Sequence, residues 1–172
     1  MEQYSRKEDA ASVERSVGRF LSTLVHAMQA NRILEIGTGY GYATLWMALA
    51  QPPLGRIWTI DPDIERTGVA RSYFARAGED DYIEILNQPA LDILPIFPQR
   101  NMDIAFVDAR PEEYPAYLEQ CLPLLKLSGL IVFNGLLEKG ADDFNRRFLQ
   151  HPDLDATILP FEAGLGLGAR VK

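Results

Sequence analysis

The stretch Arg32-Ile-Leu-Glu-Ile-Gly-Thr-Gly-Tyr-Gly-Tyr-Ala43 decides the fold of this 172-residue chain. Residues 32–36 are rich in leucine and isoleucine, which indicates a short buried strand. Glycines at positions 37, 39 and 41 let the backbone bend sharply, and a helix is predicted over residues 42–50. A strand that runs through a glycine turn into a helix is the repeating unit of a parallel α/β sheet.

The rest of the chain repeats this alternation, with Gly, Pro or Asp at the joins. We predict further strands at residues 56–60, 82–86, 103–107 and 130–133, and extended pieces at 157–161 and 167–171. Helices are predicted near the start, where Ser5 and Glu8 have capping-box spacing, and at residues 63–77, 114–125 and 142–149. The glycines at 164–168 are predicted to form a flexible turn into an edge strand. The pattern predicts a doubly wound α/β fold with helices on both faces of the sheet.

Length, charge and cysteine usage limit the organisation and the partners. A chain of 172 residues with 47% hydrophobic residues has room for one core, so residues 1–172 are predicted to form a single domain. The net charge of −7 repels phosphate backbones and disfavours nucleic acid. Cys121 has no second cysteine to pair with, and no apolar stretch has the length of a membrane span. A reducing, cytoplasmic location without membrane attachment is therefore expected.

Acidic residues mark the carboxyl ends of the predicted strands, which is where open parallel sheets bind ligands. Asp61 ends the second strand and is placed to accept both hydroxyls of a ribose. Glu35, directly before the glycines, is unfavourable beside a pyrophosphate and favourable beside a cationic ligand such as S-adenosylmethionine. The G-x-G-x-G spacing also differs from the G-x-G-x-x-G of dinucleotide folds. A nicotinamide-dependent oxidoreductase shares the ribose carboxylate and is one alternative at this point.

Four motifs in order resemble one family. They are the stretch 32–43, Thr59-Ile-Asp61, Phe106-Val-Asp108-Ala109 with Tyr114 beyond it, and Ser128-Gly-Leu-Ile-Val. Together they resemble the class I S-adenosylmethionine-dependent methyltransferases, and more narrowly the catechol and caffeoyl-CoA O-methyltransferase-like group, O-methyltransferase family 3. The resemblance extends from about Ser12 to the end of the chain. It implies a seven-stranded Rossmann-like sheet whose last strand is antiparallel, and S-adenosylmethionine as cofactor.

The resemblance also implies a set of site residues. The methionine end of the cofactor is expected at the glycine turn, the ribose at the end of the second strand, and the adenine along the turn after the third strand, where the family has Gly-Asp instead of Gln88-Pro89. The implied cofactor-binding residues are Glu35, Gly37, Thr38, Gly39, Tyr40, Gly41, Asp61, Pro62, Gln88, Pro89, Ala90 and Asp108. Asp108 is also the implied catalytic residue, as a base or as a group that orients the nucleophile.

One part of the family pattern is missing. Members of this group hold a divalent cation, with one ligand at the position of Asp108 and an Asp-Asn pair where this chain has Asn134-Gly135. A lysine common in the family is replaced by Pro111. One carboxylate and one amide are too few oxygen ligands for a tight Mg²⁺ site, although Asn134 and water could support a weak one, so no metal ligands are assigned.

The sequence therefore predicts O-methylation of a small molecule, without the divalent metal of the family. The alternative is a catalytically degenerate module that keeps the cofactor or only the fold. The family commonly forms dimers, so a homodimer is an open possibility. The methyl acceptor is not identified by any motif.

Overall fold

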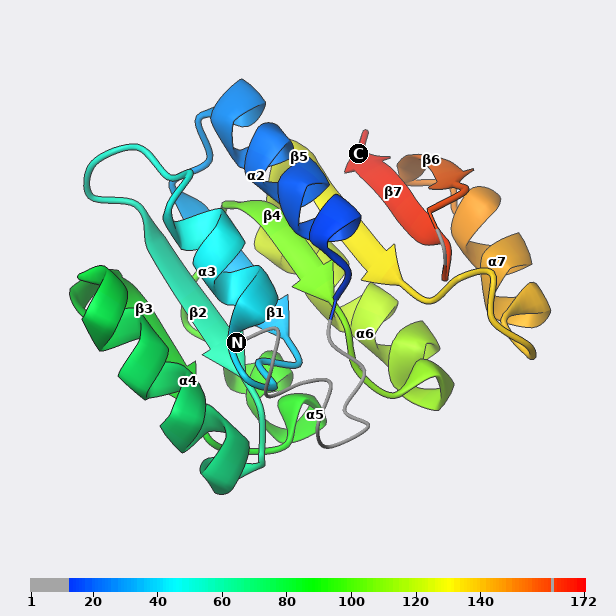
Figure 1. Cartoon of the computed structure of the whole chain (residues 1–172). Coiled ribbons are helices and arrows are strands. Elements are labelled where there is room, and N and C mark those ends of the chain that lie inside the picture. The colour runs from blue at the N-terminus through cyan, green and yellow to red at the C-terminus, as the bar shows by residue number, and fades with distance from the viewer. Residues whose placement is uncertain (1–12, 162) are drawn as a thin grey trace.

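The computed structural model describes residues 13–161 and 163–172 and is built around a seven-stranded sheet (Figure 1). The strand order is β3-β2-β1-β4-β5-β7-β6. β7 runs antiparallel to both of its neighbours, and all other neighbouring pairs are parallel. The strands are β1 (Arg32–Ile36), β2 (Arg56–Ile60), β3 (Ile83–Leu86), β4 (Met102–Val107), β5 (Leu125–Asn134), β6 (Leu154–Leu159) and β7 (Leu165–Arg170). This confirms the predicted sheet with its antiparallel last strand.

Helices cover both faces of the sheet, and each face has its own apolar core. The α-helices are α2 (Arg15–Met28), α3 (Tyr42–Ala48), α4 (Ile64–Ala77), α5 (Ala90–Ile93), α6 (Tyr114–Cys121) and α7 (Asp142–Leu149). Short 3-10 turns are η1 (Asp80–Tyr82), η2 (Leu94–Ile96), η3 (Pro111–Glu113) and η4 (Leu122–Leu124). Helices α2, α3 and α4 pack on one face (Figure 1), and α5, α6 and α7 contribute to the core on the other.

Helix α2 buries one apolar face. Val17, Leu21 and Val25 are buried, and Gly18 lets α2 approach α3 so closely that an added Cβ would lie 2.4 Å from the ring of Trp46. The capping-box prediction at Ser5 and Glu8 lies outside the described residues. Among the residues that are described, no helix is long and apolar enough to span a bilayer.

The prediction for the glycines at 164–168 was wrong. Residues from Leu165 onward belong to β7, which lies between β5 and β6, so the edge strand is β6. Added Cβ atoms at Gly166 and Gly168 would lie 3.0 and 3.1 Å from the ring of Phe148. These glycines therefore let α7 pack closely on the strand. Because they have no side chains, the predicted extended piece at 167–171 missed the first two residues of β7.

The fifth strand is also longer than the predicted residues 130–133. β5 begins at Leu125, and its register against β4 shifts between the pairs Met102–Leu125 and Ile104–Leu130. Ser128, inside this irregular part, has a positive φ of 62°. Residues 126–128 are not buried and Gly129 has no side chain, so this part of the strand lacks the continuous apolar run of residues 130–133.

Candidate functional site

A cavity of about 580 Å³ lies at the carboxyl ends of the central strands. The predicted cofactor-binding residues that line it are Gly37, Thr38, Gly39, Tyr40, Asp61, Pro62, Pro89, Ala90 and Asp108. They come from four connections of the sheet, and only the parallel arrangement of β1, β2, β3 and β4 brings them to one place. This is the location at which open α/β sheets bind ligands.

The glycines of the turn serve different purposes. Gly37 has a φ of +94°, and an added Cβ would lie 2.0 Å from the backbone oxygen of Asp108, so this glycine lets the ends of β1 and β4 meet. An added Cβ on Gly41 would lie 2.6 Å from Phe74 in α4. At Gly39 the same added atom would meet nothing within 4 Å. Gly39 is therefore the glycine whose backbone is open to a ligand.

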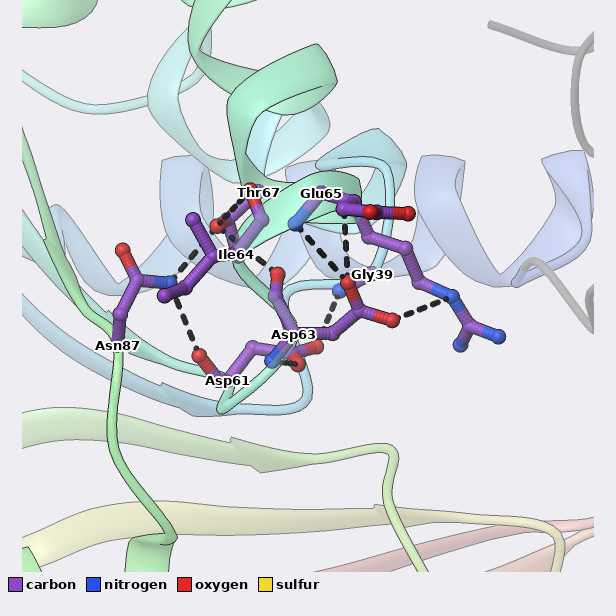
Figure 2. A network of polar contacts seen from close by, with 8 residues as sticks. Gly39, Asp61, Asp63, Ile64, Glu65, Thr67 and Asn87 are labelled. Carbon is purple, nitrogen blue, oxygen red and sulfur yellow. Dashed lines mark hydrogen bonds and ion pairs between the residues drawn. The ribbon is translucent and has the colours of Figure 1, made fainter.

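Asp61 is fixed by backbone donors from two segments (Figure 2). Its Oδ2 accepts a hydrogen bond from the N–H of Gly39 at 2.8 Å, and its Oδ1 accepts one from the N–H of Asp63 at 2.9 Å. Asn87 donates to the backbone oxygen of Asp61 at 3.0 Å and to Thr67 Oγ1 at 2.7 Å. Each carboxylate oxygen retains a lone pair, so Asp61 can accept two further hydrogen bonds from a ligand diol.

Asp63, not Asp61, caps helix α4. Its Oδ1 accepts the N–H groups of Glu65 and Arg66, both at 3.0 Å. Arg66 also pairs with Asp63, 3.2 Å between Nε and Oδ2, and its guanidinium lies 5.9 Å from the ring centroid of Tyr40. Tyr40, Asp63 and Arg66 all line the cavity. Sequence reasoning missed Arg66, although its position three residues after the cap places it on the same helix face.

Glu35 lies behind the glycine turn and does not line the cavity. It is fully buried, and its Oε2 accepts hydrogen bonds from Thr44 in α3 and Thr59 in β2, both at 2.5 Å. Thr59 Oγ1 in turn lies 2.6 Å from Thr38 Oγ1, and Thr38 does line the cavity. Burial raises the pKa of Glu35 to about 8 against the lowering effect of the two threonine hydroxyls.

The turn after β3 is divided between the cavity and solvent. Pro89 and Ala90 line the cavity, together with Leu91 and Asp92, which were not predicted. Gln88 is exposed and lies outside the wall, as does Gly41 of the glycine turn. The apolar side of this turn, with one carboxylate beside it, suits a flat heterocycle that carries an amino group.

Asp108, after β4, also lines the cavity, and the last residue of β5 holds its side chain in place. Its Oδ1 accepts a hydrogen bond from Asn134 Nδ2 at 3.0 Å, and Tyr114 donates to the backbone oxygen of Asn134 at 2.8 Å. Burial raises the pKa of Asp108, the hydrogen bond from Asn134 lowers it, and the charge of Glu138 raises it. A carboxylate with a raised pKa is a better proton acceptor for a weakly acidic hydroxyl.

A second polar group lies at the rim beside Asp108. Arg110 forms an ion pair with Glu113, and the hydroxyl of Tyr117 hydrogen-bonds to the same carboxylate. All three line the cavity. Arg110 and Tyr117 therefore border the cavity next to Asp108.

The residues at the end of β4 and β5 do not fit a divalent cation. Asn134 presents its N–H to Asp108, so its amide oxygen does not converge with that carboxylate, and Gly135 offers no side chain. Within residues 13–161 and 163–172, no three His, Cys, Asp or Glu side chains form a possible metal site. One carboxylate is too small a donor set for Mg²⁺, which needs near-octahedral oxygen ligation.

The O-methyltransferase family pattern matches residues 2–147. The chain belongs to this family. It is 37% identical to the catechol O-methyltransferase of Mycobacterium tuberculosis over 161 residues, which cover 86% of this chain and 73% of that protein. It is 38% identical to the caffeoyl-CoA O-methyltransferase of Populus kitakamiensis over 141 residues, or 77% of this chain and 60% of that protein.

Solved structures agree with this family. The O-methyltransferase from Bacillus cereus was crystallised with S-adenosylhomocysteine (SAH). It superposes with a TM-score of 0.90 at 27% identity, and the match covers 98% of this chain and 88% of that one. The chain is therefore an S-adenosylmethionine-dependent O-methyltransferase by family. The alternative of a nicotinamide-dependent oxidoreductase does not hold.

Proposed function

We propose that this methyltransferase transfers a methyl group from S-adenosylmethionine to a hydroxyl oxygen of a small molecule, without a divalent cation. The observation that carries the proposal is the Asp61 carboxylate, held by the N–H groups of Gly39 and Asp63 at the wall of the cavity. A carboxylate fixed in this way accepts the two ribose hydroxyls with little loss of side-chain entropy.

The remaining contacts of the cofactor follow from the cavity wall. We assign the methionine part to the turn Gly37 to Tyr40, with Glu35 and Gly41 supporting that turn from behind. Pro62 lies beside the ribose, and Pro89 and Ala90 lie along the adenine. Gln88 supports this turn from outside the cavity wall, where its N–H donates to the backbone oxygen of Leu86 at 3.0 Å.

Asp108 is the proposed catalytic residue. In the reaction, a lone pair of the acceptor oxygen forms a bond to the methyl carbon while the carbon–sulfur bond breaks and its electrons stay on sulfur. The hydroxyl proton passes to the Asp108 carboxylate. Asn134 and Tyr114 keep that carboxylate in place, and alignment of the two reacting atoms supplies most of the rate enhancement.

The departure at the metal position favours acceptors that need no chelation. A cation would bind two neighbouring oxygens of a catechol. Asp108 with Asn134 offers one proton acceptor and too few oxygen ligands to bind a cation. We therefore propose an acceptor with a single reacting hydroxyl, such as a phenol. The same departure also supports a second candidate, a degenerate module that binds the cofactor without turnover.

Further parts of the proposal concern organisation and location. A single domain over residues 1–172 is supported by a sheet with a core on each face. A reducing, cytoplasmic compartment is supported by the free, buried thiol of Cys121. The net charge of −7 supports a small-molecule partner over nucleic acid. A homodimer is also proposed, and sedimentation of the purified chain tests it.

Cofactor binding and turnover test the proposal in two steps. We expect S-adenosylhomocysteine to bind in calorimetry with the same affinity in Mg²⁺ and in EDTA. Turnover of simple phenols and catechols with S-adenosylmethionine is then expected to be unchanged by EDTA. Binding without turnover of any acceptor would favour the degenerate module, and strict dependence on Mg²⁺ would refute the metal-free mechanism.

A further inference from the structure

A line of hydroxyl groups connects the cavity to a buried carboxyl group. Thr38 lines the cavity, its Oγ1 lies 2.6 Å from Thr59 Oγ1, and Thr59 donates to Glu35 Oε2 at 2.5 Å. Thr44 donates to the same oxygen at 2.5 Å from the other side and has no part in this line. Glu35, Thr44 and Thr59 are each fully buried.

The number of protons fixes the direction of these hydrogen bonds. A hydroxyl has one proton to donate. When Glu35 is ionised, Thr59 donates to it, Thr38 must donate to Thr59, and the lone pairs of Thr38 are left for the cavity. When Glu35 is protonated and donates to Thr59, Thr59 can donate to Thr38, and the proton of Thr38 is left for the cavity. The charge of Glu35 therefore decides what Thr38 offers to a ligand.

Glu35 is poised between these two states. Among the described residues, its Oε1 is buried without a hydrogen-bond partner, which disfavours the ionised form. The charged groups that act on it are Asp61 at the end of β2 and Asp108 at the end of β4, and both raise its pKa. With burial as the largest cause, the pKa is about 8, so a positive charge placed nearby shifts the equilibrium at neutral pH.

We propose that Glu35 is a positioning residue that responds to the charge of the cofactor through Thr59 and Thr38, being ionised when S-adenosylmethionine is bound and protonated when S-adenosylhomocysteine is bound. This inference rests on the proposed function. Binding of the sulfonium expels one proton from Glu35 to solvent along Thr59 and Thr38. Methyl transfer leaves a neutral thioether, and Glu35 regains a proton from solvent. Thr38 then presents its proton to the cavity in place of one lone pair, which favours release of the product over the substrate.

The matched pair Thr59→Val and Thr44→Val isolates the relay. Each variant removes one buried donor to the same oxygen at the same distance, but only Thr59 connects Glu35 to Thr38. The measurement is the ratio of affinities for S-adenosylmethionine and S-adenosylhomocysteine by calorimetry between pH 7 and pH 9. The sulfonium lowers the pKa of the α-amino group of S-adenosylmethionine, so the pH dependence of the ratio in Glu35→Gln serves as the background for the titration of the ligands themselves.

In the wild-type protein this ratio is expected to rise by up to about tenfold from pH 7 to pH 9, as a group with a pKa of about 8 ionises. Thr44→Val is expected to keep the rise and to move it to higher pH, because a donor to the carboxylate is lost. Thr59→Val is expected to flatten it. An equal rise in both valine variants would overturn the relay.

Proton counting provides the second readout. Calorimetry in buffers of different ionisation enthalpy is expected to show a proton released with S-adenosylmethionine and not with S-adenosylhomocysteine. Glu35→Gln is expected to abolish the release, and Asp108→Asn is expected to keep it. If Asp108→Asn abolishes the release instead, Glu35 is not the responding group. Binding of both ligands without any linked proton contradicts this inference alone, and absence of binding contradicts the proposed function as well.

Discussion

The two ends of the cavity are built in different ways. At the proposed ribose end, Asp61 receives two hydrogen bonds from backbone N–H groups of separate segments. At the proposed acceptor end, Asp108 receives one from the side chain of Asn134. The first carboxylate is thus fixed by the fold itself, whereas the second depends on the identity of a single neighbouring side chain.

This difference explains which family features the chain retains. Backbone donors are present whatever the side chains are, so the ribose end depends only on the glycine turn and Asp61. The acceptor end changes its chemistry when one residue changes, because an amide at position 134 offers a proton to Asp108 where a carboxylate would offer a further cation ligand. We therefore expect cofactor binding to tolerate side-chain changes better than acceptor chemistry does.

Gly37 joins the two ends, and its substitution is expected to have the largest effect. Gly37→Ala would place a Cβ 2.0 Å from the backbone oxygen of Asp108 at a φ of +94°. We expect a loss of about 3 kcal/mol in the free energy of unfolding. Gly39→Ala, with nothing within 4 Å of the added atom, is the matched control. It should cost about 1 kcal/mol from its positive φ alone, and equal losses in urea unfolding would show that the close approach does not matter.

Asp61→Asn tests the ribose end and is expected to have the next largest effect. The amide cannot accept from both backbone N–H groups, and it loses the charge that strengthens bonds to the ribose hydroxyls. We expect the binding free energy of S-adenosylhomocysteine to weaken by about 2 kcal/mol, which is a roughly 30-fold rise in the Kd measured by calorimetry. Asp63→Asn keeps a good helix cap and should change Kd by less than about threefold. Similar losses in the two variants would contradict the special role of Asp61.

Asn134→Ala tests the acceptor end and is expected to have the smallest effect. Loss of one hydrogen bond to Asp108 should lower kcat by about tenfold and leave cofactor affinity unchanged. Because that hydrogen bond lowers the pKa of Asp108, its loss raises this pKa, and the acid limb of the kcat profile should move to higher pH. Tyr114→Phe, which keeps the Asn134 side chain, should leave the limb in place. An unmoved limb in both variants would argue against Asp108 as the base.

Much of the fold and part of the site could be predicted from local patterns. Strands β1, β2 and β4 and helix α4 were located to within a residue, because buried strands and helix ends have strong local signals. The start of β7 and its place inside the sheet were missed, because Gly166 and Gly168 interrupt the apolar pattern. Glycine is needed at these positions for close packing against Phe148, a contact between residues far apart in the chain.

The sequence by itself determined the alternation of strands and helices, the glycine turn and the acidic strand ends, because these depend on residues adjacent in the chain. The tertiary structure alone decided that Glu35 is withdrawn behind the turn, that Thr59 connects it to Thr38, and that Asn134 offers its N–H to Asp108. These contacts join residues from different strands and turns, and their geometry is set by strand register and helix packing. Neither strand register nor helix packing can be deduced from the spacing of residues along the chain.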